Sequence, residues 1–323
     1  MRLVYFGTPG IAVPPLERLC ADGRAPLLVV TRPDRPRGRG QKPAPSPVRA
    51  AAESRGLPVV TPARASAPEE LERLRALMPD LILLVAYGQI LSRPLLEIPR
   101  VGALNVHFSL LPRHRGASPV QAAILAGDAE TGVTTMWMTE GLDEGPVFLF
   151  ETTRIGPEEN AGDLAGRLAV MGAGALARTL DRIERGEIVR TPQDDAGATY
   201  APKITAEMSL LSVRESAASF ARHVRALEPE PGAYLDLGRE RLQVLAAEPD
   251  EDSGTGGPPG GGADPGTVLA LDPARGLKLR LAHGSIWLRR VRPSGRREMS
   301  GRDYANGARL KPGARLPLRA GEG

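Results

Sequence analysis

The chain has 323 residues, which is long for one hydrophobic core and predicts two domains. Hydrophobic residues make up 41% and charged residues 25%, values typical of a globular protein, and the single cysteine excludes an internal disulfide. The N-terminal apolar run ends at a Gly-Thr-Pro-Gly turn, too early for a signal peptide or a membrane span. We therefore expect a cytoplasmic protein with no membrane partner.

Positive charge is concentrated towards the C-terminus. The formal net charge is +4, but residues 275–319 hold thirteen Lys or Arg against two acids, so the rest of the chain is net acidic. A basic surface on an otherwise acidic protein indicates a polyanionic partner, most commonly nucleic acid. The alternative, on charge alone, is a solvated Arg-rich surface.

Short apolar runs rich in β-branched residues alternate with helical segments over the first 150 residues. These runs are LVYF (3–6), LLVVT (27–31), PVV (58–60), LILLVAY (81–87) and ALNVHF (103–108). LILLVAY is apolar at every position, as expected for a strand covered by helices on both faces. The pattern predicts an α/β domain with a doubly wound parallel sheet, whose ligand site lies at the carboxyl ends of the strands.

Apolar residues at helical spacing predict a long amphipathic helix that ends at Gly186 and closes a first domain, residues 1–188. Residues 189–207 are polar without periodicity, which predicts a linker. A helix around SAASFARHVRAL and five short strands then predict a second domain, residues 208–318, built as a small, mostly β, OB-like barrel. Its glycine-rich segment 252–266 cannot pack a core, and we expect it to be disordered.

Asn105 and His107 stand two positions apart on a predicted strand, so their side chains project from one face about 7 Å apart. An imidazole can accept the proton of an attacking amine near neutral pH, and an amide can donate to an oxyanion. The pair alone is weak evidence, because a histidine near a strand end is usually only hydrogen-bonded. Asp143, in the glycine-flanked loop GLDEG, would fix the tautomer of His107.

A long motif surrounds these residues. It reads N-V-H-x-S-L-L-P-R-x-R-G-A-x-P, then A-I-L-A-G-D-A-E-T-G-V-T, then G-L-D-E-G. This motif resembles the 10-formyltetrahydrofolate-dependent formyltransferases. Four further strings are similar to the members of that family that act on methionyl-tRNA: MRLVYFGTPGIAVPPLERL, TRPDRPRGRGQKPAPSPVRAAAESRGLPV, VAYGQIL and TYAPKIT. The similarity spans nearly the whole first domain.

The resemblance implies transfer of a formyl group from 10-formyltetrahydrofolate to the α-amino group of methionine on initiator methionyl-tRNA, for translation initiation. The amine would attack through a tetrahedral intermediate, and the family's catalytic trio falls on Asn105, His107 and Asp143. His107 would accept the proton, Asn105 would stabilise the oxyanion, and Asp143 would hold His107 and stabilise its charged form. No metal is required, and we expect a monomer.

The resemblance also implies two binding regions. The folate would be carried by Ala86, Tyr87, Gly88, Gln89, Ile90, Leu91, Ser109, Leu110, Leu111 and Pro112. The basic segment 32–49, too rich in Pro and Gly for a core element, is expected to be a loop that contacts the tRNA acceptor stem. Its tRNA-binding residues would be Arg37, Arg39 and Lys42.

The sequence departs from the family at two positions near the trio. Phe108 stands where Gly is common, and His114 stands where Trp or Tyr is common; Phe108 should point to the opposite face of the strand and pack there. The second domain resembles the family less, with RALEPEPGAY and LLSV in place of Trp-containing segments and with the glycine-rich insertion.

Three alternative functions fit the sequence less well. GTPG after the first strand lacks the three-glycine spacing of a dinucleotide-binding motif. A glycinamide ribonucleotide or sugar-nucleotide formyltransferase would share the trio, but the former has no need of a second, basic domain. A catalytically silent RNA-binding protein would not need an intact trio.

Overall fold

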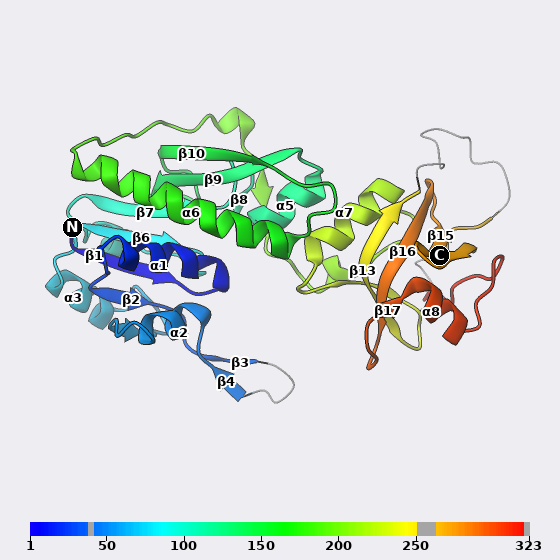
Figure 1. The fold of residues 1–323 in the computed structure, drawn as a ribbon. Helices are drawn as coiled ribbons and strands as arrows, with labels where there is room; N and C mark the ends of the chain where they lie inside the picture. The colour runs from blue at the N-terminus through cyan, green and yellow to red at the C-terminus, as the bar shows by residue number, and fades with distance from the viewer. Residues whose placement is uncertain (38–41, 251–262, 320–323) are drawn as a thin grey trace. The chain divides into compact units, whose positions relative to one another are not determined.

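The computed structural model describes residues 1–37, 42–250 and 263–319, and the chain divides into two compact units (Figure 1). The first unit comprises residues 1–123, 129–155 and 164–203. The second comprises residues 124–128, 156–163 and the chain from Ile204 onward. The main chain thus leaves the first unit inside the segment predicted as a linker. None of the helices in the described ranges is long and apolar enough to span a membrane.

A seven-stranded sheet forms the centre of the first unit, in the order β10-β9-β7-β6-β1-β2-β5. Its strands are β1 (Leu3–Gly7), β2 (Leu28–Val30), β5 (Val59–Val60), β6 (Leu81–Val85), β7 (Gly102–His107), β9 (Glu130–Trp137) and β10 (Val147–Arg154). The five strands from β7 to β5 are parallel, as predicted. β9 pairs antiparallel with β7, and β10 pairs antiparallel with β9; the sequence analysis missed both strands. β10 begins with the apolar run VFLF, but only Val147 and Phe148 are buried. From Leu149 onward its side chains alternate between half-buried and exposed, and the run gives way to Glu and Thr, unlike a fully buried parallel strand.

Helices cover both faces of this sheet, which confirms the doubly wound fold. α1 (Val13–Ala21) and α6 (Ala161–Glu184) lie on one face, where the hydroxyl of Tyr5 donates to the Ala12 carbonyl and Arg24 pairs with Asp181. α3 (Pro68–Ala76) and α4 (Arg93–Leu96) cover the other face. The core there contains Val4, Phe6, Ile82, Leu84, Leu74 and Leu95. The predicted long helix is α6, followed by Gly186 with a φ of 83°.

The remaining elements of the first unit are short. They are a 3-10 turn (Gly10–Ala12), α2 (Pro47–Glu53), β8 (Arg115–Gly116), α5 (Pro119–Ala126), a 3-10 turn (Asp195–Gly197) and β11 (Tyr200–Ala201). The last turn of α5, from Ile124, falls in the second unit. The segment predicted as a basic loop contains an antiparallel hairpin of β3 (Arg35–Arg37) and β4 (Lys42–Ala44). Arg37 and Lys42 are backbone partners in this hairpin, whereas Arg39 lies outside the described residues.

The second unit is an antiparallel sheet in the order β12-β13-β16-β15-β14, with β17 paired to β16. Its elements are a 3-10 turn (Glu207–Ser209), α7 (Ala217–Leu227), β12 (Ala233–Asp236), β13 (Arg241–Pro249), β14 (Val268–Asp272), β15 (Gly276–Arg280), β16 (Ser285–Pro293), β17 (Met299–Ser300) and α8 (Gly301–Gly307). Register shifts in β13 between Val244 and Ala247 bend the sheet. Phe220, Val224 and Leu227 on the apolar face of α7 complete the core.

The second unit therefore confirms the predicted helix followed by a mostly β domain, and all five predicted strands are present. The prediction of disorder for the glycine-rich segment falls mainly on residues 251–262, outside the described part of the chain.

Candidate active site

β7 positions Asn105 and His107 at the carboxyl end of the parallel strands. Asn105 is paired in register with Leu84 of β6 and Met136 of β9, and His107 with Thr134 of β9. Because the two residues are separated by one position on a strand, their side chains project from the same face. Their exposed fractions are only 6% and 5%, so both polar groups are buried and need partners.

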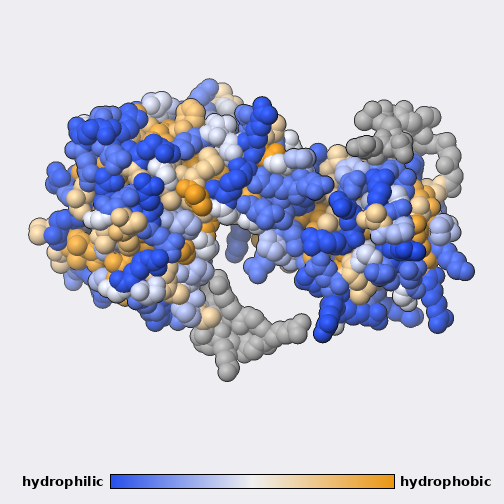
Figure 2. All heavy atoms as spheres, viewed as in Figure 1, coloured by the Kyte–Doolittle hydropathy of each residue, from blue (hydrophilic) through white to orange (hydrophobic). Residues whose placement is uncertain are grey.

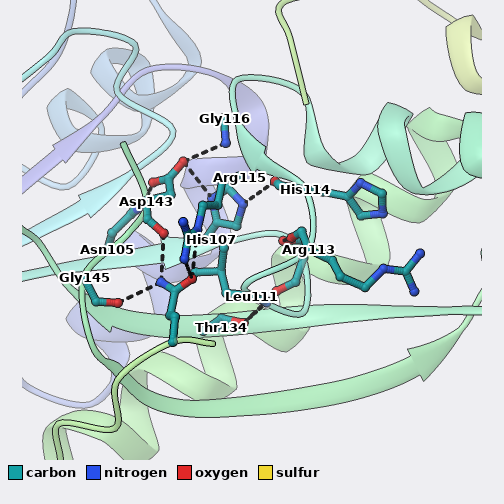
Figure 3. Close-up of polar contacts among 12 residues, drawn as sticks. Asn105, His107, Leu111, Arg113, His114, Arg115, Gly116, Thr134, Asp143 and Gly145 are labelled. Atoms are coloured by element: carbon teal, nitrogen blue, oxygen red, sulfur yellow. Dashed lines mark hydrogen bonds and ion pairs between the residues drawn. The ribbon is translucent and has the colours of Figure 1, made fainter. Parts of the chain in front are cut away.

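The carboxylate of Asp143 lies between these two side chains (Figure 3). The Asn105 amide donates to Oδ1 of Asp143 at 3.2 Å, and the His107 Nδ1 atom lies 3.6 Å from Oδ2. The backbone N–H of Gly116 also donates to Oδ2, at 2.9 Å. The three residues that sequence analysis singled out as a trio therefore come together around one carboxylate.

The loop between β9 and β10 gives Asp143 an unusual backbone. Its φ is 54°, in the left-handed region that an L residue other than glycine adopts at a cost of about 1–3 kcal/mol. A Cβ on Gly145 would overlap the Trp137 carbonyl oxygen, so the glycine allows the loop to pack against its own strand. Packing within the protein therefore requires a glycine at position 145.

A backbone carbonyl, and not Asp143 as expected from the sequence, fixes the tautomer of His107. Nε2 of His107 lies 2.9 Å from the carbonyl oxygen of His114, and a carbonyl oxygen can only accept, so Nε2 carries a hydrogen. In the neutral ring Nδ1 is then the basic atom, and it faces Asp143. His114 has a φ of 58°, and its own N–H donates to the Thr199 hydroxyl at 2.8 Å.

Ser109–Pro112, the first segment implied for folate, directly follows β7 and is held against β9. The Thr134 hydroxyl donates to the Ser109 carbonyl at 2.7 Å and accepts from the N–H of Leu111 at 3.2 Å. The neighbouring Phe108 is buried, and its ring lies against Gly172 of α6, on the opposite face from His107. Phe108 therefore packs in the core, as expected.

Ala86–Leu91, the second segment implied for folate, follows β6 at the same edge of the sheet. Ala86 and Gly88 have φ values of 46° and 82°, so the chain turns sharply there. Tyr87 and Leu91 are buried in the core, and burial raises the pKa of the Tyr87 hydroxyl to about 12. Ile90 is 87% exposed. A ligand at this segment would therefore meet backbone and the Ile90 side chain.

The structure also shows two residues at the site that the sequence analysis missed, Gln193 and Arg115. The Gln193 amide nitrogen donates to the carbonyls of Asp143 and Gly145, both at 2.8 Å. Its oxygen accepts from Arg115, at 3.0 Å from Nε and 2.8 Å from Nη2. Gln193 lies in the segment predicted as a linker, where the absence of periodicity gave no signal of its role.

Backbone strain is concentrated at the same place. Five residues other than glycine have positive φ in the described ranges, and three of them, Ala86, His114 and Asp143, belong to the segments just described. Such strain persists where the surrounding structure holds it, and it is typical of functional sites. Across the described residues there is no group of three or more His, Cys, Asp or Glu side chains placed to hold a metal ion.

Comparison with protein families gives the class of the protein. Residues 1–180 match the formyl transferase family, and residues 203–309 match the formyl transferase C-terminal domain. A relative from Halorhodospira halophila named methionyl-tRNA formyltransferase is 48% identical over 312 residues, which cover 97% of this chain and 98% of the relative. The chain belongs to the formyl transferases and, within them, to the methionyl-tRNA formyltransferase family.

Two solved structures share the fold at low sequence identity. HypX from Aquifex aeolicus, solved with tetrahydrofolic acid, has a TM-score of 0.61 and 18% identity over 94% of this chain and 47% of its own. The N-formyltransferase from Helicobacter canadensis, solved with folinic acid and dTDP-3-aminofucose, has a TM-score of 0.63 and 16% identity over 89% of this chain and 98% of its own. Both likenesses concern the fold alone.

Proposed function

We propose that this protein transfers the formyl group of 10-formyltetrahydrofolate to the α-amino group of methionine on initiator methionyl-tRNA. The observation that carries the proposal is the Asp143 carboxylate, which contacts both the Asn105 amide and the His107 ring in a chain whose full-length relatives carry the name of this activity. The folate supplies the formyl group already at the oxidation level of the product. The amine nitrogen would form the new bond to the formyl carbon, the bond from that carbon to N10 of the folate would break, and N10 would take up the proton lost by the amine as tetrahydrofolate leaves.

His107 would accept the proton of the attacking amine. Nε2 already donates to a backbone carbonyl, so Nδ1 is the atom with a lone pair in the neutral ring. A proton taken up at Nδ1 would face Oδ2 of Asp143 across 3.6 Å, and the carboxylate would stabilise the resulting imidazolium.

Asn105 would stabilise the negative charge that develops on the formyl oxygen. One hydrogen of its amide nitrogen is directed at Asp143, which fixes the orientation of the side chain. The second hydrogen of the same nitrogen remains for the oxyanion. Asp143 thus orients both groups without taking a proton itself.

Exposed apolar side chains support a folate site beside the trio. Ile90 is 87% exposed, and Leu142, next to Asp143, is 49% exposed. The flat rings of a folate packed against these two side chains would remove their apolar surface from water. Their two loops are adjacent, because Arg93 and Glu140 are 3.7 Å apart. Backbone of Ala86–Leu91 and Ser109–Pro112 would supply the hydrogen bonds.

We assign tRNA binding to residues 208–318, joined by residues 189–207 to a catalytic domain of residues 1–188, with Arg37, Arg39 and Lys42 contacting the acceptor stem. Much of the second unit in view is hydrophilic (Figure 2). Within residues 275–319, the exposed cations without an ion pair to another described residue are Arg296, Arg297, Arg302, Arg309 and Lys311. We also propose that the protein acts as a monomer, and the tRNA substrate favours a cytoplasmic location.

A panel of acceptors tests this proposal. The full chain is incubated with 10-formyltetrahydrofolate and either initiator methionyl-tRNA, glycinamide ribonucleotide or a dTDP-amino sugar. We expect formylmethionine only in the first reaction, released after hydrolysis of the aminoacyl ester. Formylation of either small acceptor at a higher kcat/KM than the tRNA would overturn the proposed acceptor.

A further inference from the structure

We propose that Gln193 is a positioning residue that holds the Asp143 loop in its catalytic conformation. The inference rests on the proposed function, but it concerns a segment whose sequence indicates only a linker. Gln193 contacts neither His107 nor Asn105 through any hydrogen bond of the described residues. It acts on them through the backbone of Asp143.

Every hydrogen-bonding position of the Gln193 side-chain amide is used. Both hydrogens of the nitrogen are directed at loop carbonyls, those of Asp143 and Gly145, at 2.8 Å each. The oxygen accepts two hydrogens from the Arg115 guanidinium, whose side chain is only 11% exposed. An amide with all four positions satisfied is fixed in one orientation. Gln193 therefore forms a rigid link between the Asp143 loop and Arg115.

Arg115 also lies next in the chain to a residue that contacts the Asp143 carboxylate. The residue after it, Gly116, donates its backbone N–H to Oδ2 of Asp143 at 2.9 Å. Gln193 thus holds Asp143 from its backbone and, through Arg115, holds the strand that donates to its side chain. These contacts form a closed ring that fixes both the loop and the direction of the carboxylate.

The chain around Gln193 is itself anchored along its length. The Trp137 indole donates to the Val189 carbonyl at 2.7 Å, and Thr191 exchanges two backbone hydrogen bonds with Val147 at 2.8 and 3.0 Å. Beyond Gln193, β11 pairs with β8, which contains Arg115. Residues 189–201 are therefore hydrogen-bonded to the end of β9 and the start of β10, which flank the Asp143 loop, and to β8. This part of the predicted linker belongs structurally to the first unit.

The Asp143 loop needs such support because Asp143 has a positive φ, a strained conformation that relaxes when its contacts are removed. A displacement of about 1 Å at a catalytic group can lower the rate about 10²-fold. We therefore expect loss of the Gln193 contacts to lower kcat while the KM values for folate and tRNA stay within about threefold.

Two substitutions at Gln193 and one matched control test the role. Gln193→Ala removes all four contacts. Gln193→Glu keeps an acceptor for Arg115 but replaces the donor that faces the two carbonyls. We expect both to lower kcat about 10- to 100-fold. Asp195→Asn is the control, because Asp195 also pairs with Arg115, at 2.7 Å, but is exposed and, among the described residues, has no hydrogen bond or ion pair with the Asp143 loop.

Asp195→Asn should keep the wild-type kcat. If Gln193→Ala proves unstable in a thermal melt, Gln193→Glu decides, since it retains the link to Arg115. A kcat within threefold of wild type in Gln193→Glu would overturn the inference, as would a loss confined to KM.

A double-mutant cycle separates positioning from a general structural role. If Gln193 acts through Asp143, adding Gln193→Ala to Asp143→Asn should lower the residual rate less than threefold, because the group it positions is already impaired. Full additivity would contradict the proposal. Failure of the wild type to formylate methionyl-tRNA would instead reject the proposed function, so the two failures are distinguishable.

Discussion

Each unit of the molecule contains a histidine held between a backbone carbonyl and a carboxylate. In the first unit, Nε2 of His107 faces the His114 carbonyl and Nδ1 faces Asp143 at 3.6 Å. In the second, Nε2 of His223 lies 2.5 Å from the Met208 carbonyl and Nδ1 lies 3.3 Å from Glu215. The pairwise contacts are almost the same, so they do not define a catalytic site by themselves.

The surroundings of the two histidines differ. His107 shares its carboxylate with Asn105, at the edge of a parallel sheet and beside two segments with positive φ. His223 lies within α7, and the other oxygen of Glu215 accepts from the Ser219 hydroxyl, so that network ties one helix to the preceding turn. Convergence of an amide, a strained loop and the carboxyl ends of parallel strands distinguishes the proposed catalytic site from the site around His223.

The largest effect should come from His107. His107→Gln keeps a donor for the His114 carbonyl but removes the base, and general base catalysis contributes about 10²- to 10⁴-fold. We expect kcat to fall by that factor while folate and tRNA bind within about threefold of wild type. Stopped-flow formylation and equilibrium binding measure the two quantities. A variant that retains half of the wild-type kcat would show that His107 is not the general base.

A smaller effect should come from single cations of the second unit, which act through summed charge. Arg297 is exposed and has no ion pair with another described residue, whereas Arg290 pairs with Glu298 at 2.8 Å. Arg297→Gln should reduce the salt slope of tRNA binding by about 1, because one phosphate contact is lost. Arg290→Gln is the matched control and should change the slope less. Equal changes would mean that ion pairing within the unit does not decide which cations bind tRNA.

The smallest effect on catalysis should come from His223, which we expect to affect stability alone. Burial lowers the pKa of His223, but the hydrogen bonds to Glu215 and to the Met208 carbonyl outweigh it and raise the pKa above its usual value. The contribution of protonated His223 to the free energy of unfolding is therefore fully present below about pH 6.5, the usual pKa of histidine. It is lost as the pH rises through the raised pKa.

His223→Gln should remove this pH dependence and cost about 1 kcal/mol of unfolding free energy at pH 6, with wild-type kcat. Denaturant unfolding at pH 6 and pH 9 tests the expectation. A wild-type free energy of unfolding that is higher at pH 9 than at pH 6 would show that the predicted direction is wrong.

Local patterns in the sequence account for the parallel sheet and for the placement of Asn105 and His107. LILLVAY and ALNVHF have the apolar runs of buried strands, and the two-residue spacing puts both polar side chains on one face. The antiparallel strands β9 and β10 were missed. Threonines interrupt the apolar pattern of β9, and the apolar run of β10 covers only the first half of the strand.

Gln193 was missed for a different reason. Its contacts to Asp143 and Arg115 span 50 and 78 positions along the chain. A polar segment without periodicity carries no local sign of contacts at such separations. Residues held by tertiary hydrogen bonds to backbone carbonyls are therefore the part of the site that a single sequence does not reveal.

One labelled-transfer experiment tests the central claim directly. 10-Formyltetrahydrofolate labelled in its formyl group is mixed with initiator methionyl-tRNA and with equal folded concentrations of wild type, His107→Gln and His223→Gln. The account predicts labelled formylmethionine at matching rates from wild type and His223→Gln, and a rate at least about 10²-fold lower from His107→Gln. No label on methionine with the wild type, or similar rates from all three proteins, would contradict it.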